Sequence, residues 1–199
     1  MRVAAVALFG TGYRDGCPPG VDPVRFGRAL IEDVADVLAS LSQVDTALVA
    51  DESTVDDAKA VAWPGMALVT AGGPAAAFEA LGGLGYQEAA LFVADAPDLP
   101  ALLAAKPFSG LSTADTAVVP SQPVGLIALA SRIPAPAWLP STVDLDTPDA
   151  LELLRAAAPA PGALAVAPSW RRLRAPADLS SLDPALEGWE MTRSLLSGR

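Results

Sequence analysis

Histidine is absent from this chain of 199 residues, and cysteine occurs only once, as Cys17. Without histidine there is no Ser-His-Asp triad, no His-ligated zinc and no imidazole acid or base. A lone cysteine forms no internal disulfide, which favours a reducing compartment, and without an imidazole base it is a weak candidate for a nucleophile. Any catalysis therefore depends on carboxylates, Lys, Arg, backbone amides or a hard metal ion bound by oxygen.

Positive charge is also scarce. The chain has 13 Lys and Arg residues against 23 Asp and Glu residues, a formal net charge of -10, and its only lysines are Lys59 and Lys106. This balance argues against a nucleic-acid partner. One dense basic cluster, Ser169–Arg174, predicts either a contact with phosphate or with an acidic surface, or a solvated run that offsets nearby acids. Charge runs more often face solvent, so the solvated surface is the more common case.

No apolar run is long enough to span a bilayer, so the sequence predicts no membrane partner. The first apolar stretch, Val3–Phe9, is near the lower limit for a signal peptide, and no small-x-small cleavage site follows it. A buried first strand is the better interpretation. Together with the lone cysteine, this leads us to expect a cytoplasmic protein.

Apolar runs and helical periodicities alternate along the first three quarters of the chain. This order predicts an α/β domain over residues 1–155, with a mainly parallel, doubly wound, Rossmann-like sheet and right-handed crossovers. Residues 156–199 are predicted to form a C-terminal extension, with one more strand at 164–167 and a tail helix within 179–196 that docks on the sheet or on a second subunit. The predicted strands are 3–9, 46–50, 66–70, 89–94, 116–119 and 125–130, and the predicted helices are 25–42, 55–62, 74–84, 99–105 and one that starts at Thr147-Pro148.

Asp95 directly follows the apolar run Leu91–Ala94, in the segment Asp95-Ala96-Pro97-Asp98-Leu99. Open α/β sheets bind ligands at the carboxyl ends of their strands. A carboxylate at such an end is well positioned to hold a divalent metal ion, and the prolines that follow restrict the backbone. The alternative is that Asp95 only caps the turn into the next helix.

A glycine-rich segment, Gly10–Gly16, follows the first predicted strand. Glycines allow positive φ and close backbone approach, so such a loop can present N–H groups to a phosphate. The segment does not have the strict dinucleotide-binding spacing, and no Gly-Lys-Ser/Thr follows as in a Walker loop. We expect this glycine loop to form a pocket with Arg14 close to Asp95, because both follow the carboxyl ends of neighbouring parallel strands.

Four segments, in this order, carry a resemblance to a known family. Ala7–Gly16 is similar to Leu-x-x-Gly-x-Gly-x-Arg-x-Gly, with matches at Gly10, Gly12, Arg14 and Gly16; Pro23–Glu32 to Pro-Val-x-Gly-Arg-Pro-Leu-Ile-Glu, with one extra residue; Asp95–Leu99 to Asp-x-Pro-x-Leu; and Asp144–Leu151 to Asp-x-Asp-Thr-Pro-x-x-Leu. Over residues 1–155 the chain resembles a divergent small nucleotidyltransferase of the glycosyltransferase-A-type (nucleotide-diphospho-sugar transferase-like) fold. Relatives in this family include molybdenum-cofactor guanylyl- and cytidylyltransferases, phospholactate guanylyltransferase and the DUF2064 glycosyltransferase-like proteins.

The resemblance implies a function and a site. It implies binding of an NTP or a nucleotide sugar together with a small acceptor, and transfer assisted by Mg²⁺ or Mn²⁺. Catalysis would come from positioning and charge stabilisation, which suits a chain without histidine. The implied catalytic residues are Arg14 and Asp95. The implied nucleotide-binding residues are Gly10, Thr11, Gly12, Arg14 and Gly16, and the implied metal ligands are Asp95 and Asp146, with Asp144 as a further candidate and helix capping as the alternative for this pair.

Two departures leave a second hypothesis open. The family carries a lysine after the glycine loop, and its place falls near Pro19 here; Arg25 or Arg28 would have to replace it. The Asp-Gly-Gly-Tyr segment of the DUF2064 relatives is replaced by Pro120–Leu126. The chain is therefore expected to be either a metal-dependent transferase or a catalytically degenerate binding or scaffold protein, with a homodimer through the C-terminal extension as a further expectation.

Overall fold

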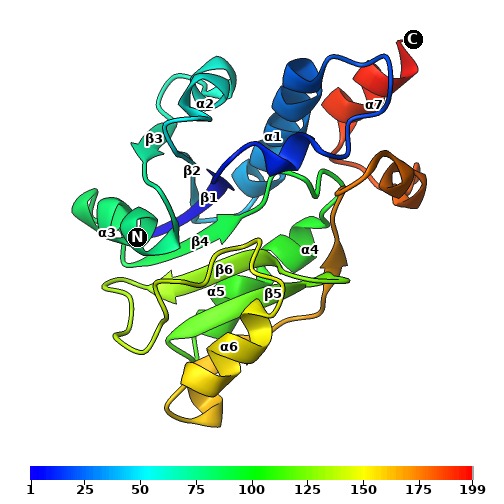
Figure 1. Ribbon diagram of the computed structural model, residues 1–199. Helices are drawn as coiled ribbons and strands as arrows, with labels where there is room; N and C mark the ends of the chain where they lie inside the picture. Colours follow the sequence, from blue (N-terminus) through cyan, green and yellow to red (C-terminus); the bar gives the residue numbers. More distant parts are fainter. Residues whose placement is uncertain (199) are drawn as a thin grey trace.

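The computed structural model describes residues 1–198 as a mixed α/β protein built on one sheet (Figure 1). The strands lie in the order β3-β2-β1-β4-β6-β5-β7, and β8 pairs with β5 beside this path. The strands are β1 Arg2–Leu8, β2 Asp45–Ala50, β3 Ala67–Thr70, β4 Glu88–Phe92, β5 Thr116–Gln122, β6 Leu126–Arg132, β7 Leu164–Val166 and β8 Trp170–Arg171. The helices are α1 Pro23–Ala39, α2 Val55–Val61, α3 Pro74–Gly83, α4 Ala101–Ala104, α5 Lys106–Leu111, α6 Ala150–Ala157 and α7 Glu190–Ser197, with 3-10 turns at Gly12–Arg14, Pro161–Ala163 and Pro176–Ser181.

The centre of the sheet is parallel and covered on both faces. Residues Val3–Leu8 of β1 are buried without interruption, as expected for a strand with helices on both sides. β1 pairs in parallel with β2 and with β4, and Val6 faces Phe92 in that register. The segments that follow these two strands, Gly10–Gly16 and Asp95, therefore emerge side by side at the carboxyl edge.

The prediction of a mainly parallel α/β sheet is confirmed, with one exception. β6 runs antiparallel to both of its neighbours, β4 and β5. Only residues 123–125 separate β5 from β6, which is enough for a hairpin but too short for the crossover that a parallel pair requires. The antiparallel strand therefore follows from the length of this connection.

The predicted helix start at Thr147 is wrong by two residues. α6 begins at Ala150, with Asp149 at the N-cap. The hydroxyl of Thr147 instead donates to Asp144 Oδ1 at 3.0 Å and accepts from the Asp144 backbone N–H at 3.1 Å. Thr147 therefore closes a local turn ahead of the helix.

Two other helical segments differ from the prediction. α5 was not predicted as a separate helix, and the tail is helical only over α7 and the 3-10 turn Pro176–Ser181.

The C-terminal extension is joined to the rest of the molecule. β7 and β8 both pair with β5, and α7 lies beside α1 (Figure 1). Between them, Leu173 is buried in a second hydrophobic cluster together with Phe26, Leu30, Leu182 and Trp189. Gly16 of the glycine loop lies against Leu173, because a Cβ atom at Gly16 would come within 2.8 Å of the Leu173 carbonyl oxygen.

Asp33 of α1 fixes the start of α7. Its side chain is 1% exposed, and its two oxygens accept the backbone N–H groups of Met191 at 2.9 Å and Thr192 at 2.8 Å. These are N–H groups of the first helical turn, which have no partner within their own helix. Burial raises the pKa of Asp33 to about 6, although the hydrogen bonds from Thr192 and Met191 oppose this rise.

No helix among residues 1–198 is long and apolar enough to cross a membrane.

The close packing of Gly16 on Leu173 can be tested with two glycine variants. We expect Gly16→Ala to lower the free energy of unfolding by about 1–3 kcal/mol, because the new methyl group meets a backbone carbonyl that cannot turn aside. Gly12→Ala is the matched control, since its Cβ would meet nothing closer than 3.8 Å, and its effect should stay within about 0.5 kcal/mol. Urea unfolding of both variants measures the difference; equal losses would contradict this packing.

The buried carboxyl of Asp33 predicts a pH dependence. Its folded-state pKa lies above the ordinary value of 3.8, so the folded protein binds this proton more tightly than the unfolded chain does. Its contribution to stability is therefore present at low pH and is lost as the pH rises through about 6. Between about pH 7.5 and pH 5 the wild type should gain about 1 kcal/mol of unfolding free energy relative to Asp33→Asn, measured by urea unfolding at both values. A difference that does not change with pH would contradict the shift.

Candidate functional site

Asp95 lies at the carboxyl edge of the sheet, three residues after β4 ends at Phe92, and it is fully buried. The chain leaves the strand through Val93, whose N–H donates to the carbonyl of Ile127 on β6. Because Asp95 is buried away from water, its carboxylate needs a partner inside the protein. That partner comes from the C-terminal extension.

Arg172 supplies the first partner of Asp95. Its Nε lies 2.7 Å from Asp95 Oδ1, and its Nη1 lies 2.8 Å from Asp146 Oδ1. Nη1 also donates to the carbonyls of Leu145 at 3.1 Å and Leu126 at 3.3 Å. The Arg172 side chain is only 4% exposed. One buried guanidinium therefore joins the end of β4, the start of β6 and the 144–146 segment.

Arg174 reaches the same two carboxylates from the surface. Its Nε lies 3.3 Å from Asp95 Oδ2, and its Nη2 pairs with Asp146 Oδ1. The Arg174 side chain is 35% exposed and that of Asp146 is 44% exposed. A Cβ atom placed on Gly12 would lie 3.9 Å from Arg174 Nη1, so this guanidinium lies between the glycine loop and the acids. We call Asp95, Asp146, Arg172 and Arg174 the arginine–aspartate cluster.

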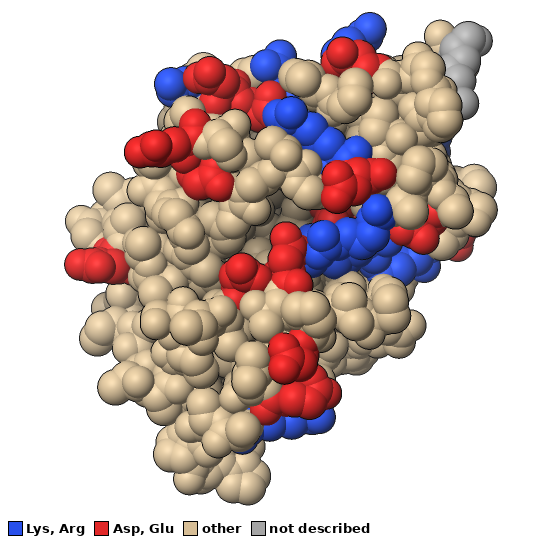
Figure 2. All heavy atoms as spheres, in the orientation of Figure 1, with Lys and Arg blue, Asp and Glu red and all other residues tan. Residues whose placement is uncertain are grey.

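Figure 2 shows acidic and basic side chains side by side over the middle of one face, next to a hollow. Burial raises the pKa of Asp95, while the positive charges of Arg172 and Arg174 oppose that rise. Asp95 Oδ2 is buried and makes no hydrogen bond within residues 1–198, and it lies 3.3 Å from Arg174 Nε. The two halves of this carboxylate thus differ: Oδ1 is bonded to Arg172, and Oδ2 faces the more exposed arginine.

The carboxylates expected to hold Mg²⁺ or Mn²⁺ do not fit a divalent cation in this arrangement. Asp95 and Asp146 are both paired with arginines, and the four charges of the cluster sum to zero. Hard divalent ions require several oxygen ligands with net negative charge. Across residues 1–198 the structure contains no group of three or more Asp, Glu, His or Cys side chains that could surround a metal ion. Asp144 lies nearby but accepts from the Asp146 backbone N–H at 2.8 Å.

The glycine loop faces the cluster across a small cavity of about 20 Å³, lined among others by Gly10, Tyr13, Asp144, Asp146 and Arg172. Gly10 has φ +78°, a conformation that favours glycine, and its N–H donates to Asp51 Oδ2 at 2.6 Å. Hydrogen bonds from Gly10, Ser53 and Thr54 lower the pKa of Asp51 despite its partial burial. An aspartate therefore already binds one amide that a phosphate-binding loop would present, while Thr11 is exposed and Gly12 is half-buried.

Arg14 points into a different network. Its Nη2 pairs with Asp57 of α2, which also accepts from the Tyr13 hydroxyl at 2.5 Å and pairs with Arg28 Nε at 3.1 Å. Burial opposes ionisation of Asp57, but the hydrogen bonds from Tyr13 and Arg14 outweigh it and lower its pKa. Burial and the bond to Asp57 raise the pKa of Tyr13. Neither Arg14 nor Asp95 is among the residues that line the small cavity, so this cavity is not the expected Arg14–Asp95 pocket.

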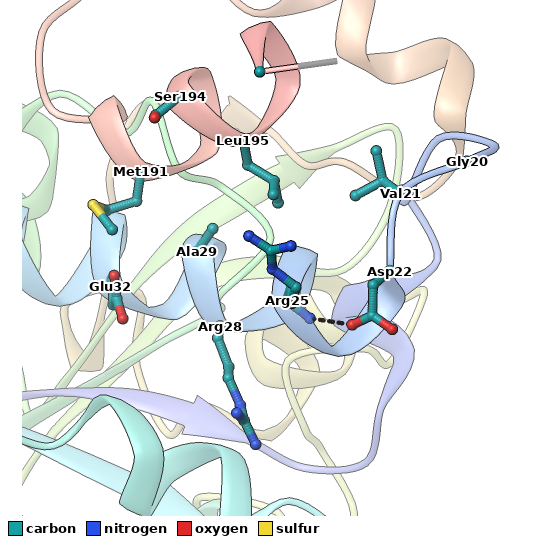
Figure 3. A pocket seen from close by; sticks show the side chains of 11 residues that line it. Gly20, Val21, Asp22, Arg25, Arg28, Ala29, Glu32, Met191, Ser194 and Leu195 are labelled. Atoms are coloured by element: carbon teal, nitrogen blue, oxygen red, sulfur yellow. Dashed lines mark hydrogen bonds between the residues drawn. The ribbon is translucent and has the colours of Figure 1, made fainter.

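A larger cavity of about 490 Å³ lies between α1 and α7 (Figure 3). In it, Arg25 points toward Leu195 of α7, while Arg28 points the opposite way. The two arginines expected to replace the missing lysine thus extend in different directions. Arg28 is held by Asp57, and Arg25 faces the groove beside α7.

The residues of the candidate site that sequence reasoning missed are Arg172 and Arg174. They belong to the basic cluster Ser169–Arg174, and the interpretation of that cluster as a solvated surface is wrong for Arg172, which is 6% exposed. The neighbouring Arg171 and the Trp170 indole both bond to the buried Asp98. Two features of the sequence could have indicated these arginines. The chain is strongly acidic and has only one dense basic run, and the Asp95–Leu99 segment carries two aspartates that need positively charged partners if they are buried.

No protein-family model and no curated protein matches the chain. Among solved structures, the chain is similar to a Desulfovibrio desulfuricans G20 protein assigned as a nucleotide-diphospho-sugar transferase, with 18% identity, a TM-score of 0.66 and coverage of 98% of this chain and 96% of that chain. It is also similar to a nucleotidyl transferase from Methanothermobacter, with 12% identity, a TM-score of 0.58 and coverage of 100% and 99%.

A third similar structure is a Mycobacterium tuberculosis H37Rv protein crystallised as a complex with manganese, with 19% identity, a TM-score of 0.53 and coverage of 99% and 98%. These likenesses extend over nearly the whole length of each chain, so they include the C-terminal extension as well as residues 1–155. With the sheet order and the carboxyl-edge site, they show that the chain has the nucleotide-diphospho-sugar transferase fold.

Proposed function

We propose that this chain binds an NTP or a nucleotide sugar, together with a small acceptor, as a divergent nucleotidyltransferase-like or glycosyltransferase-like protein. The nucleotide phosphates would lie over Thr11 and Gly12, and the acceptor would lie toward Asp144 and Asp146. The observation that carries this proposal is that Gly10 of the glycine loop lines one cavity with Asp146 and with Arg172, the partner of Asp95. This cavity lies at the carboxyl edge of the sheet, where the neighbouring parallel strands β1 and β4 end.

Arg174 is the cation best placed to meet a phosphate. Its guanidinium lies beside Gly12, and it is the more exposed arginine of the cluster. A planar guanidinium binds two phosphate oxygens at once, and such charge-assisted pairs are about twice as strong as neutral hydrogen bonds. The expected role of Arg14 as a phosphate contact requires its release from Asp57, so Arg174 takes that role in our proposal.

A catalytically degenerate binding protein is the second candidate. The observation in its favour is that three donors at or near the glycine loop already have an aspartate partner: Gly10 with Asp51, Arg14 with Asp57, and Arg174 with Asp146. The only lysines, Lys59 of α2 and Lys106 of α5, lie outside the glycine loop and the cluster. A homodimer through the C-terminal extension stays a prediction under either candidate, as does a cytoplasmic location.

Nucleotide binding can be tested with one charge-removing variant. NTPs and nucleotide sugars, titrated in turn by calorimetry, should include one that binds, and Arg174→Gln should weaken its affinity by about tenfold or more. The reason is that the variant removes a charged hydrogen bond of about 1.5–3 kcal/mol, and about 1.4 kcal/mol corresponds to tenfold. Arg155→Gln is the matched control: Arg155 is exposed, lies in α6 and should leave the affinity unchanged.

Two results would contradict this assignment. If no compound of the panel binds at millimolar concentration, nucleotide binding is wrong. If Arg174→Gln and Arg155→Gln bind equally well, the nucleotide does not lie against the cluster. With a bound nucleotide in hand, release of pyrophosphate or of a nucleoside diphosphate in the presence of candidate acceptors separates the transferase from the degenerate binding protein.

A further inference from the structure

We propose that the guanidinium of Arg172 permanently occupies the place of a divalent cation at this site, so that a nucleotide binds without metal and its phosphates are met by Arg174. This inference deepens the proposed function and rests on it for the nucleotide. It also makes a statement about the protein alone, namely that Asp95 and Asp146 form a site filled by arginine and closed to metal ions.

The burial and bonding of Arg172 support permanent occupation. Its side chain is 4% exposed and contacts Asp95 and Asp146 as well as the carbonyls of Leu126 and Leu145. The backbone on either side is held too, since β8 ends at Arg171 and the N–H of the following Leu173 donates to the Asp95 carbonyl at 2.7 Å. Removal of Arg172 would leave the buried Asp95 carboxylate without its nearest cation, since the remaining contact to Arg174 is longer, at 3.3 Å. The arginine is therefore part of the folded core.

The local charge also opposes a metal ion. The two aspartates of the cluster are balanced by the two arginines, so a divalent ion would enter a neutral site and stand next to a fixed positive charge. At separations near 4 Å, like charges repel strongly even when the surroundings are moderately polar. By contrast, a guanidinium needs no vacant coordination positions and holds its charge at every physiological pH.

Arg174 differs from Arg172 in ways that suit exchange with a ligand. It is 35% exposed, its Nε lies 3.3 Å from Asp95 Oδ2, and that oxygen makes no hydrogen bond. Its other partner, Asp146, is itself 44% exposed, and exposed ion pairs contribute little stability. An incoming phosphate can therefore draw Arg174 toward Gly12 while Arg172 continues to neutralise Asp95. One arginine replaces the cation, and the other binds the ligand.

The first arm of the test uses manganese alone. Mn²⁺ is titrated into the full, nucleotide-free chain, and free Mn²⁺ is measured by electron paramagnetic resonance. We expect the wild type and Asp146→Asn to give superimposable curves. Asp56→Asn is the control for weak binding to a surface of net charge -10, because the Asp56 side chain is 89% exposed and far along the chain from the cluster. One bound Mn²⁺ that Asp146→Asn loses and Asp56→Asn keeps would overturn the proposal.

The second arm uses the nucleotide that binds best, titrated in EDTA and in millimolar Mg²⁺. We expect dissociation constants within about twofold of each other, since the cation that the phosphates meet is Arg174. A loss of about tenfold or more in EDTA would overturn the proposal. If no nucleotide binds at all, the proposed function fails, and the manganese arm still decides whether arginine has replaced the metal.

A third variant tests the replacement directly. Arg172→Met removes the charge and keeps most of the side-chain volume, so it should expose two carboxylates to metal. We expect it to gain an Mn²⁺ site that is lost again in Arg172→Met/Asp146→Asn, with circular dichroism used to check folding. A folded Arg172→Met protein that gains no such site would show that Arg172 was not what excluded the metal, and would overturn the proposal. If Arg172→Met fails to fold, the two wild-type arms decide.

Discussion

The structure depends on one buried ion pair, between Asp95 at the end of β4 and Arg172 of the C-terminal extension. Asp95 is fully buried and Arg172 nearly so, and they meet at 2.7 Å. A buried pair of this kind adds little net stability compared with an apolar pair, but loss of one partner costs about 3–5 kcal/mol, because the other charge is left without compensation. The pair therefore acts as a constraint. Asp95 can stay buried at the end of β4 only if residues 170–174 lie across the carboxyl edge of the sheet and bring Arg172 to it.

That constraint explains the arrangement of the extension. β8 adds to β5, Leu173 enters the cluster with Phe26 and Leu30, and Gly16 accommodates the Leu173 carbonyl at a distance that a larger residue would not allow. The glycine loop is thus packed from behind by the segment that carries the arginines. At the other end, Asp33 holds the first turn of α7 on α1.

Much of the fold could be predicted from the sequence, because burial on both faces leaves continuous apolar runs such as Val3–Leu8 and because α1 has a regular apolar spacing. The antiparallel direction of β6 was not predicted. It depends on the three-residue connection between β5 and β6, whereas the spacing of apolar residues indicates a strand but not its direction. For the site, the parallel pairing of β1 with β4 brings Gly10 to the same small cavity as Val93 and Ala94, which directly precede Asp95.

The partners of Asp95 could not be derived from the sequence in the same way. Arg172 lies 77 positions further along the chain, and nothing in the local pattern distinguishes a buried arginine from a solvated one. The roles given to the glycine loop, Arg14, Asp95 and Asp146 stay predictions.

Aspartates also pair with donors elsewhere along the carboxyl edge of the sheet. These pairs differ in exposure, and therefore in how readily an anion could replace the aspartate. Asp51 binds the Gly10 amide, Asp57 binds Arg14 and Arg28, and Asp146 binds Arg174. In a chain with no histidine and a net charge of -10, these aspartates already pair with Arg14, Arg28 and Arg174 before any ligand arrives. A phosphate can compete only where both partners of a pair already contact water, because exchange there requires little desolvation. Asp57 is 5% exposed, whereas Asp146 is 44% exposed, so the Arg174–Asp146 pair opens at least cost. Exposure, and not the number of positive charges, therefore determines where an anion can bind on this edge.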